Sequence, residues 1–118
     1  MFLRIQEQAE MMLKDNIVNN LNRLGAFHPH AKIMLKLTLP TKSNLYDEFV
    51  HHPNILKVVA LSGGYTRLEA NTLLAKNKGV VASFSRALSE GLTKGMTGKQ
   101  FDSTLDQSIQ SIFEASMA

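Results

Sequence analysis

The sequence predicts a single α/β domain in which parallel strands alternate with helices. Short, largely apolar stretches at residues 32–39, 55–61 and 80–84 have the length and composition of buried strands. Segments with helical spacing or helix-capping signals separate these stretches. Strands that alternate with helices pair in parallel through right-handed crossovers, and 118 residues suffice for one such domain but not for two.

The first helix is predicted over residues 2–24, because apolar residues recur there at roughly helical spacing. Gly25 is its predicted end, and Pro29 prevents its continuation. A short helix is expected over residues 44–51, before Pro53. The apolar stripe of the first helix consists of Phe2, Ile5, Ala9, Met12, Ile17 and Leu21.

Capping boxes mark two of the later helices. Thr66, followed by Glu69, opens a helix that is expected to reach residue 76, and Thr97 with Gln100 opens the last helix. Between them, a helix is expected over residues 85–92. The apolar stripe of the last helix consists of Phe101, Leu105, Ile109 and Ile112.

Composition excludes several classes of function. There is no cysteine, so disulfides, thiolate catalysis and cysteine-ligated metals are excluded. The net charge of +3 comes from scattered residues without interleaved aromatics, which gives nucleic-acid binding little support. No stretch has the length of a membrane span or the pattern of a signal peptide, so a cytoplasmic protein without a membrane partner is expected.

The four histidines do not predict a metal site. His28 and His30 flank a proline, and His51 and His52 lie at the end of a short helix. No carboxylate lies at a spacing that would complete a metal site with these histidines, and both pairs precede strands. Exposed histidines in loops are therefore expected.

Lys36 is the candidate nucleophile. Strand alternation places Ile33, Leu35, Leu37 and Leu39 on one face and Lys32, Met34, Lys36 and Thr38 on the other. If the leucine face packs on helices, Lys36 points to the second side of the sheet, where lost hydration would lower its pKa. A neutral lysine amine can form an iminium with a ketone. The alternative is an ordinary lysine that reaches water or pairs with a carboxylate.

Two strand-to-helix junctions are candidate anion sites. After the second strand, Ser62, Gly63 and Gly64 offer a hydroxyl and closely approachable backbone N–H groups, although two glycines also suit a simple tight turn. After the third strand, Ser85 and Arg86 offer a guanidinium for phosphate, although a solvated arginine at a helix start is equally compatible. Active sites of parallel α/β proteins lie at this carboxyl end of the strands.

Three linked stretches carry a family resemblance: 33–40 (IMLKLTLP), 61–66 (LSGGYT) and 82–88 (ASFSRAL). In order and spacing they resemble the end of bacterial class I, Schiff-base-forming fructose-bisphosphate aldolases, and the resemblance extends over essentially the whole chain. It implies the C-terminal portion of a (β/α)₈ barrel, with strands 6, 7 and 8 and their flanking helices.

The resemblance also implies roles for the candidate residues. Lys36 matches the Schiff-base lysine, Ser62, Gly63 and Gly64 match a phosphate-binding loop, and Arg86 with Ser85 matches a second phosphate grip. The implied reaction is reversible cleavage of fructose 1,6-bisphosphate to dihydroxyacetone phosphate and glyceraldehyde 3-phosphate, with no metal or other cofactor.

The departure from the family is length, since a full barrel takes about 250 residues. The chain is therefore expected to form one partial barrel domain over residues 1–118, with the general acid/base supplied elsewhere. A truncated or split gene product is expected, completed by an N-terminal half chain or by homo-oligomerisation. The alternative function is a non-catalytic remnant that binds phosphate or self-associates, and a transaldolase-like Schiff-base enzyme is a weaker possibility.

Overall fold

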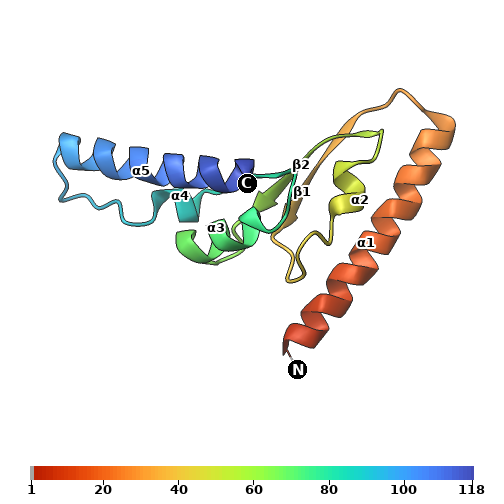
Figure 1. Cartoon of the computed structure of the whole chain (residues 1–118), viewed down its shortest axis with the longest axis horizontal. Coiled ribbons are helices and arrows are strands. Elements are labelled where there is room, and N and C mark those ends of the chain that lie inside the picture. Colours follow the sequence, from red (N-terminus) through yellow and green to blue (C-terminus); the bar gives the residue numbers. More distant parts are fainter. Residues whose placement is uncertain (1) are drawn as a thin grey trace.

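The computed structural model describes the backbone of residues 2–118 and the side chains from residue 5 onward. The molecule is elongated, 55 × 39 × 23 Å, with the strands at its centre, α1 and α2 at one end and α3 to α5 at the other (Figure 1). None of the described helices is both long and apolar enough to cross a membrane. In chain order the elements are α1 (Phe2–Phe27), β1 (Ile33–Thr38), α2 (Asp47–Val50), β2 (Ile55–Leu61), α3 (Arg67–Ala75), β3 (Val80–Ala82), α4 (Arg86–Ser89) and α5 (Gly98–Met117).

The strands form a parallel sheet in the order β1-β2-β3. This confirms the predicted α/β class with parallel pairing, and β2 has the predicted bounds. The register pairs Lys36 with Val59, and Val59 with Val81. Paired residues of parallel strands point to the same side, so these three side chains share one face of the sheet.

The two faces of the sheet differ in burial. One face is the core face, where Leu39, Val58 and Val80 are buried together with Phe49 of α2 and Leu74 of α3. The other, which we call the open face, is exposed or half-buried; its residues are Met34, Lys36, Thr38, Lys57, Val59, Leu61, Val81 and Ser83. The predicted alternation along β1 is therefore confirmed.

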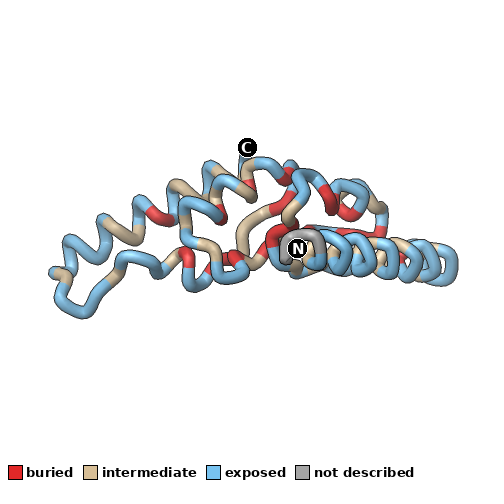
Figure 2. Tube along the Cα trace, turned by 90° about the horizontal axis from the view of Figure 1, so that it is seen from below, coloured by how far each residue is buried: buried red, intermediate tan, exposed pale blue. Residues whose placement is uncertain are grey.

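Two predictions about α1 are wrong. The helix continues through Gly25 to Phe27. Gly25 has another role than ending the helix, because a Cβ there would lie 2.7 Å from Oδ1 of the buried Asn54 and only glycine allows that close approach. Phe2 of the predicted stripe lies outside the side chains that the structure describes. Ile5 and Met12 are 60% and 66% exposed, and among the described side chains of the helix only those in its C-terminal half pack on the core. Figure 2 shows α1 mainly exposed along its length.

The short helices are shorter than predicted. The chain from Asn44 to Tyr46 forms turns rather than helix, and Asn44 itself has a positive φ of 58°. α4 ends at Ser89, because Glu90 has an extended ψ of 130° and Gly91 has a φ of +90°. Both segments therefore act as compact connections beside the sheet.

The capping boxes of α3 and α5 are confirmed, since Thr66 and Thr97 each exchange hydrogen bonds with the residue three positions later. The predicted apolar stripe of α5 is confirmed only at Ile112, which packs against the core, and in part at the half-buried Leu105. Phe101 and Ile109 are 40% and 50% exposed, whereas Ser108 is buried. The reason is that α5 meets α3 through small polar side chains, including a hydrogen bond from Asn71 to Ser111.

Candidate functional site

Lys36 lies on β1 two residues before the strand ends, on the open face. Its position on the second side of the sheet agrees with the prediction, but its shielding from water does not, because Lys36 is exposed among the residues that the structure describes. The physical reason is that the core helices pack on the opposite face, against Leu39 and Val58. The Lys36 amine would therefore be shielded from water only if another part of a protein covered the open face.

A cavity of about 440 Å³ opens at the corner where β1 ends and α1 passes. Lys36 and Thr38 line it from the strand, and Glu10 of α1 and Tyr46 line it from the other side. Both Glu10 carboxylate oxygens accept hydrogen bonds from Thr41, at 2.9 and 3.1 Å from its backbone N–H and at 2.8 Å (Oε1) from its hydroxyl. Glu10 therefore anchors the chain just after β1.

Tyr46 in the same corner is buried and holds its proton strongly. Burial, with a further contribution from the nearby Glu10 carboxylate, raises the pKa of Tyr46 to about 12. Neither Glu10 nor Tyr46 was predicted to lie at this site. The contact joins residues 31 positions apart (Glu10 and Thr41), and no local sequence signal marks it.

The diglycine loop follows β2 at the same edge of the sheet. Gly63 and Gly64 are exposed and have φ angles of +61° and +85°. A Cβ at Gly63 would lie 2.5 Å from the Thr38 methyl carbon, so the loop passes directly over the end of β1. Ser62 is only 6% exposed, so the two glycines are the accessible part of this candidate site.

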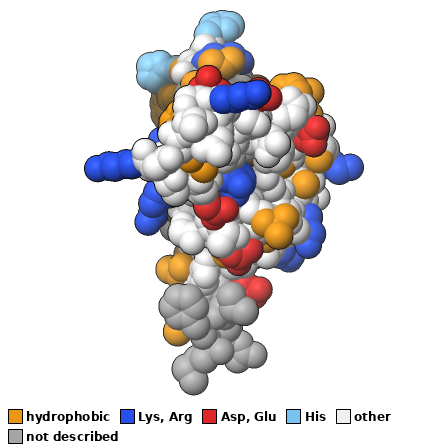
Figure 3. Space-filling view, turned by 90° about the vertical axis from the view of Figure 1, so that its left-hand side faces the viewer, with side chains coloured by type: hydrophobic (Ala, Val, Ile, Leu, Met, Phe, Trp, Pro, Cys, Tyr) orange, Lys and Arg blue, Asp and Glu red, His pale blue; other side chains and the backbone are white. Residues whose placement is uncertain are grey.

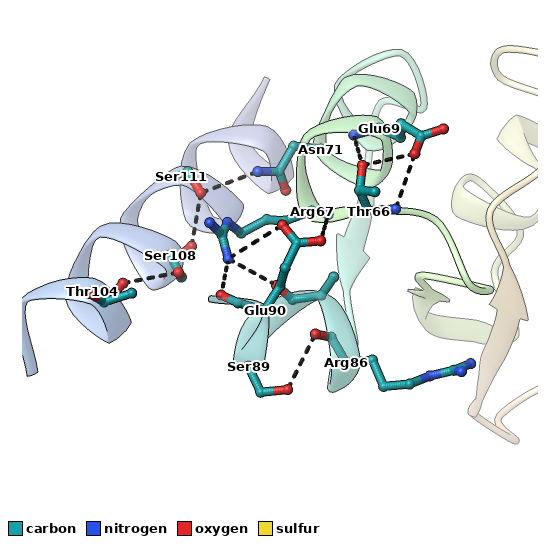
Figure 4. A network of polar contacts seen from close by, with 11 residues as sticks. Thr66, Arg67, Glu69, Asn71, Arg86, Ser89, Glu90, Thr104, Ser108 and Ser111 are labelled. Carbon is teal, nitrogen blue, oxygen red and sulfur yellow. Dashed lines mark hydrogen bonds and ion pairs between the residues drawn. The ribbon is translucent and has the colours of Figure 1, made fainter. Parts of the chain in front are cut away.

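Ser85 and Arg86 follow β3 at this edge as well. Ser85 precedes α4, and Arg86 is its first residue; both are exposed. Among the residues whose side chains the structure describes, none pairs with the Arg86 guanidinium. In Figure 4 its side chain points away from the neighbouring polar network, which leaves it available to an anion.

Arg67 and Glu90 join the start of α3 to the end of α4 (Figure 4). Arg67 opens α3 just after the diglycine loop, and its Nη1 donates to the Glu90 carbonyl at 2.7 Å and lies 3.9 Å from the Glu90 carboxylate. The Glu90 carboxylate also accepts from the Arg67 backbone N–H at 3.2 Å. These contacts fix the start of α3 against the end of α4, and no pattern in the sequence marks them.

The charged groups near these loops include no cluster suited to a cation. Within the described part of the chain, His, Asp and Glu side chains nowhere gather in threes that could hold a metal ion. His51 instead makes a local contact with the Asp47 carbonyl, and His52 contacts the Asn22 side chain of α1. On the end of the molecule drawn in Figure 3, basic, acidic and hydrophobic side chains are interspersed.

The fold places the chain among parallel α/β proteins, and sequence comparison identifies its relatives. No family model matches the chain. It is 51% identical over 111 residues to the class 1 fructose-bisphosphate aldolase of Synechocystis, 46% over 112 residues to that of Clostridium acetobutylicum and 46% over 110 residues to that of Porphyromonas gingivalis.

These matches cover 93–95% of the chain and 36–37% of the relatives. The predicted resemblance is therefore confirmed: the chain is a homologue of class 1 fructose-bisphosphate aldolases and spans about a third of their length.

Proposed function

We propose that this chain is the C-terminal part of a class 1 fructose-bisphosphate aldolase and carries its Schiff-base lysine and phosphate-binding loops. The observation that supports this most is the 46–51% identity to aldolases over nearly the whole chain. In this proposal β1, β2 and β3 are strands 6, 7 and 8 of a (β/α)₈ barrel, and residues 1–118 form one partial barrel domain. The reaction is reversible cleavage of fructose 1,6-bisphosphate, in a cytoplasmic enzyme.

Lys36 is the proposed nucleophile. Its neutral amine adds to the ketone carbon of the sugar phosphate, and loss of water forms an iminium. The iminium accepts the electron pair released when the carbon–carbon bond breaks, and this electron sink replaces a metal ion. Position on the open face supports this role, because the amine would lie inside a barrel once the remaining strands cover that face.

The two loops are proposed to bind the substrate phosphate. Gly63 and Gly64 offer exposed backbone beside Ser62, and the Arg86 guanidinium beside Ser85 neutralises charge. Both loops follow strands that end at the edge where β1 ends, which supports a single shared site. The general acid/base is proposed to come from the part of the aldolase that this chain does not represent.

Borohydride trapping tests the proposal. The chain is fused to the part of the Synechocystis aldolase that it does not match, so that catalysis does not depend on two chains finding each other. With dihydroxyacetone phosphate and borohydride, reduction of the iminium should leave a stable secondary amine on Lys36, detected by peptide mass spectrometry. Lys36→Met should abolish the adduct, and Lys32→Met, at an exposed lysine near the start of the same strand, should retain it. A folded fusion without an adduct at Lys36 would refute the proposal.

A non-catalytic phosphate-binding or self-associating module is the second candidate. The exposure of Lys36 and of the loops in the described structure favours it. In that case the isolated chain should bind inorganic phosphate in a manner that Arg86→Met weakens, and light scattering should report an oligomer. The fusion should then give no adduct with dihydroxyacetone phosphate.

A further inference from the structure

A cavity of about 320 Å³ lies between α3, the end of α4 and α5. Arg67 and Asn71 line it from α3, Glu90 from the end of α4, and Ser108 and Ser111 from α5. Figure 4 shows these polar side chains gathered between the three helices. The volume is at the low end of the range for small-molecule sites, about 300–1,000 Å³, and far exceeds the roughly 30 Å³ that one water occupies. The cavity therefore has room for a small organic molecule.

The Asn71 amide brings a buried acceptor without a partner to this cavity. Its nitrogen donates to the Ser111 hydroxyl at 3.2 Å, and that hydroxyl donates in turn to the Ser108 carbonyl at 2.9 Å. This chain of hydrogen bonds keeps the amide nitrogen towards Ser111. Asn71 Oδ1 is buried, and among the residues that the structure describes none donates to it. A buried acceptor without a donor costs free energy, so a ligand with a hydrogen-bond donor would stabilise this arrangement.

The charges that line the cavity balance each other. Glu90 holds its carboxylate 3.9 Å from Nη1 of Arg67, and that nitrogen also donates to the Glu90 carbonyl. Nε and Nη2 of Arg67 make no hydrogen bond within the described part of the chain, so they remain as donors, and Gln107 of α5 adds an exposed amide. The cavity thus offers donors and acceptors without net charge. Hydroxyl groups match such a lining, because each of them can both donate and accept.

We infer that this cavity binds a small neutral polyol. One hydroxyl of the ligand donates to Asn71 Oδ1, another accepts from the Arg67 guanidinium, and Gln107 bonds to a third. The Glu90 carboxylate disfavours an anion, because it already neutralises Arg67 and would repel a second negative charge. The inference does not rest on the proposed function, since Lys36 does not line the cavity and none of the residues that do is assigned to iminium formation or phosphate binding.

Nuclear magnetic resonance titration of the whole, isotopically labelled chain with xylitol tests the inference. The expected result is a saturable shift of the Asn71 side-chain amide signal and of the backbone amides of α3 and α5 that border the cavity, with the signals of α1 unchanged. Signals of individual residues are the readout, because polyols also stabilise proteins by exclusion from the whole protein surface. Inorganic phosphate at the same concentrations should leave the Asn71 signal unchanged.

Three variants, followed through the backbone amides of α3 and α5, locate the binding. Asn71→Leu keeps the size of the side chain but removes the acceptor, and should weaken xylitol binding on the order of tenfold, because a ligand hydroxyl is left without its partner. Asn19→Leu makes the same change at an exposed position of α1 and should leave the affinity unchanged. Gln107→Ala alters an exposed residue, so the fold is kept even if Asn71→Leu prevents folding; it should weaken binding about threefold.

Each of the other outcomes overturns the inference. With no saturable shift, the cavity holds water only. Shifts spread evenly over the chain would show a general effect of the solvent, and a shift of the Asn71 signal with phosphate would show an anion site instead. Unchanged xylitol affinity in a folded Asn71→Leu variant, or in Gln107→Ala, would place the binding elsewhere. The adduct on the fused chain judges the proposed function separately, whatever the result of this titration.

Discussion

Replacing each glycine of the diglycine loop by alanine separates two physical effects at the candidate phosphate site. Gly63 and Gly64 both have positive φ angles, +61° and +85°. A Cβ at Gly63 would lie 2.5 Å from the Thr38 methyl carbon, whereas a Cβ at Gly64 would have no atom within 4 Å. The two variants therefore share a backbone cost, and only one of them adds a steric clash.

The magnitudes follow from these geometries. An alanine held in the left-handed region costs about 1–2 kcal/mol, which is the whole expected effect of Gly64→Ala. Gly63→Ala adds an overpacked methyl contact, which costs about 1–3 kcal/mol more. Thr38→Ser removes the obstructing methyl, so the double variant Gly63→Ala/Thr38→Ser should recover most of that additional cost.

Urea unfolding followed by circular dichroism measures these differences on the whole chain. The expected order of stability is wild type, then Gly64→Ala, then Gly63→Ala, with the double variant close to Gly64→Ala. Equal destabilisation by the two alanines, within about 0.5 kcal/mol, would show that the loop does not pass over Thr38. Failure of Thr38→Ser to recover stability would also show that the Thr38 methyl does not obstruct a side chain at position 63.

Three further measurements probe other contacts. Thr97→Ala removes the capping hydrogen bond of α5 and should lower the free energy of unfolding by about 1 kcal/mol in the same urea unfolding measurements. Ser103→Ala, at an exposed position of that helix, should change the free energy of unfolding little. The free energy of unfolding should fall as pH rises from 10 towards about 12, because the unfolded chain releases the Tyr46 proton at its ordinary pKa of 10.0 while the folded chain retains it to about 12. In urea titrations at several pH values, Tyr46→Phe should reduce this dependence of stability on pH. A double-mutant cycle with Arg67→Met and Glu90→Gln isolates the ion pair between the two side chains, 3.9 Å apart, and should give a coupling energy of about 0.5 kcal/mol because the pair is partly exposed. A coupling energy near zero would show that this ion pair does not help to join the start of α3 to the end of α4.

The order and pairing of the elements could be predicted because their signals are local. Residues 55–61 are apolar in a run too short for a usual helix, and β2 has those bounds. Thr66 and Thr97 each have their capping partner three residues later, so the start of both helices can be identified without any tertiary information.

Which side of each helix faces the core could not be predicted, because it depends on the elements against which the helix packs. Periodicity alone favours Ile5 and Ile109 as inward residues, yet both are at least half exposed. Ser108 is buried instead, with its hydroxyl donating to the Thr104 carbonyl of its own helix, because α5 packs on α3 along a polar side where Asn71 donates to Ser111. Gly25 similarly has the sequence appearance of a helix end, and only the approach of Asn54 explains why a glycine stands there.

The candidate site could be predicted from the sequence only where it follows from the order of the strands. The positions of Lys36, the diglycine loop and Arg86 along their strands follow from topology, because parallel strands end at one edge of the sheet. Contacts between distant segments, such as Glu10 with Thr41 and Arg67 with Glu90, have no spacing rule that would reveal them.

Whether water reaches the Lys36 amine distinguishes the two functions considered for this chain. A phosphate-binding module needs only Arg86 and the diglycine loop, and both are accessible in the described structure. Iminium chemistry additionally needs an uncharged amine at neutral pH, and a lysine in open water keeps its proton there. An amine that reacts with acetylating reagent like any surface lysine in the isolated chain, but is selectively trapped by a ketone in the fused chain, would show that covering the open face supplies the chemistry. If Lys36 reacts with these reagents equally in the isolated chain and in the fused chain, anion binding is the function that these residues support.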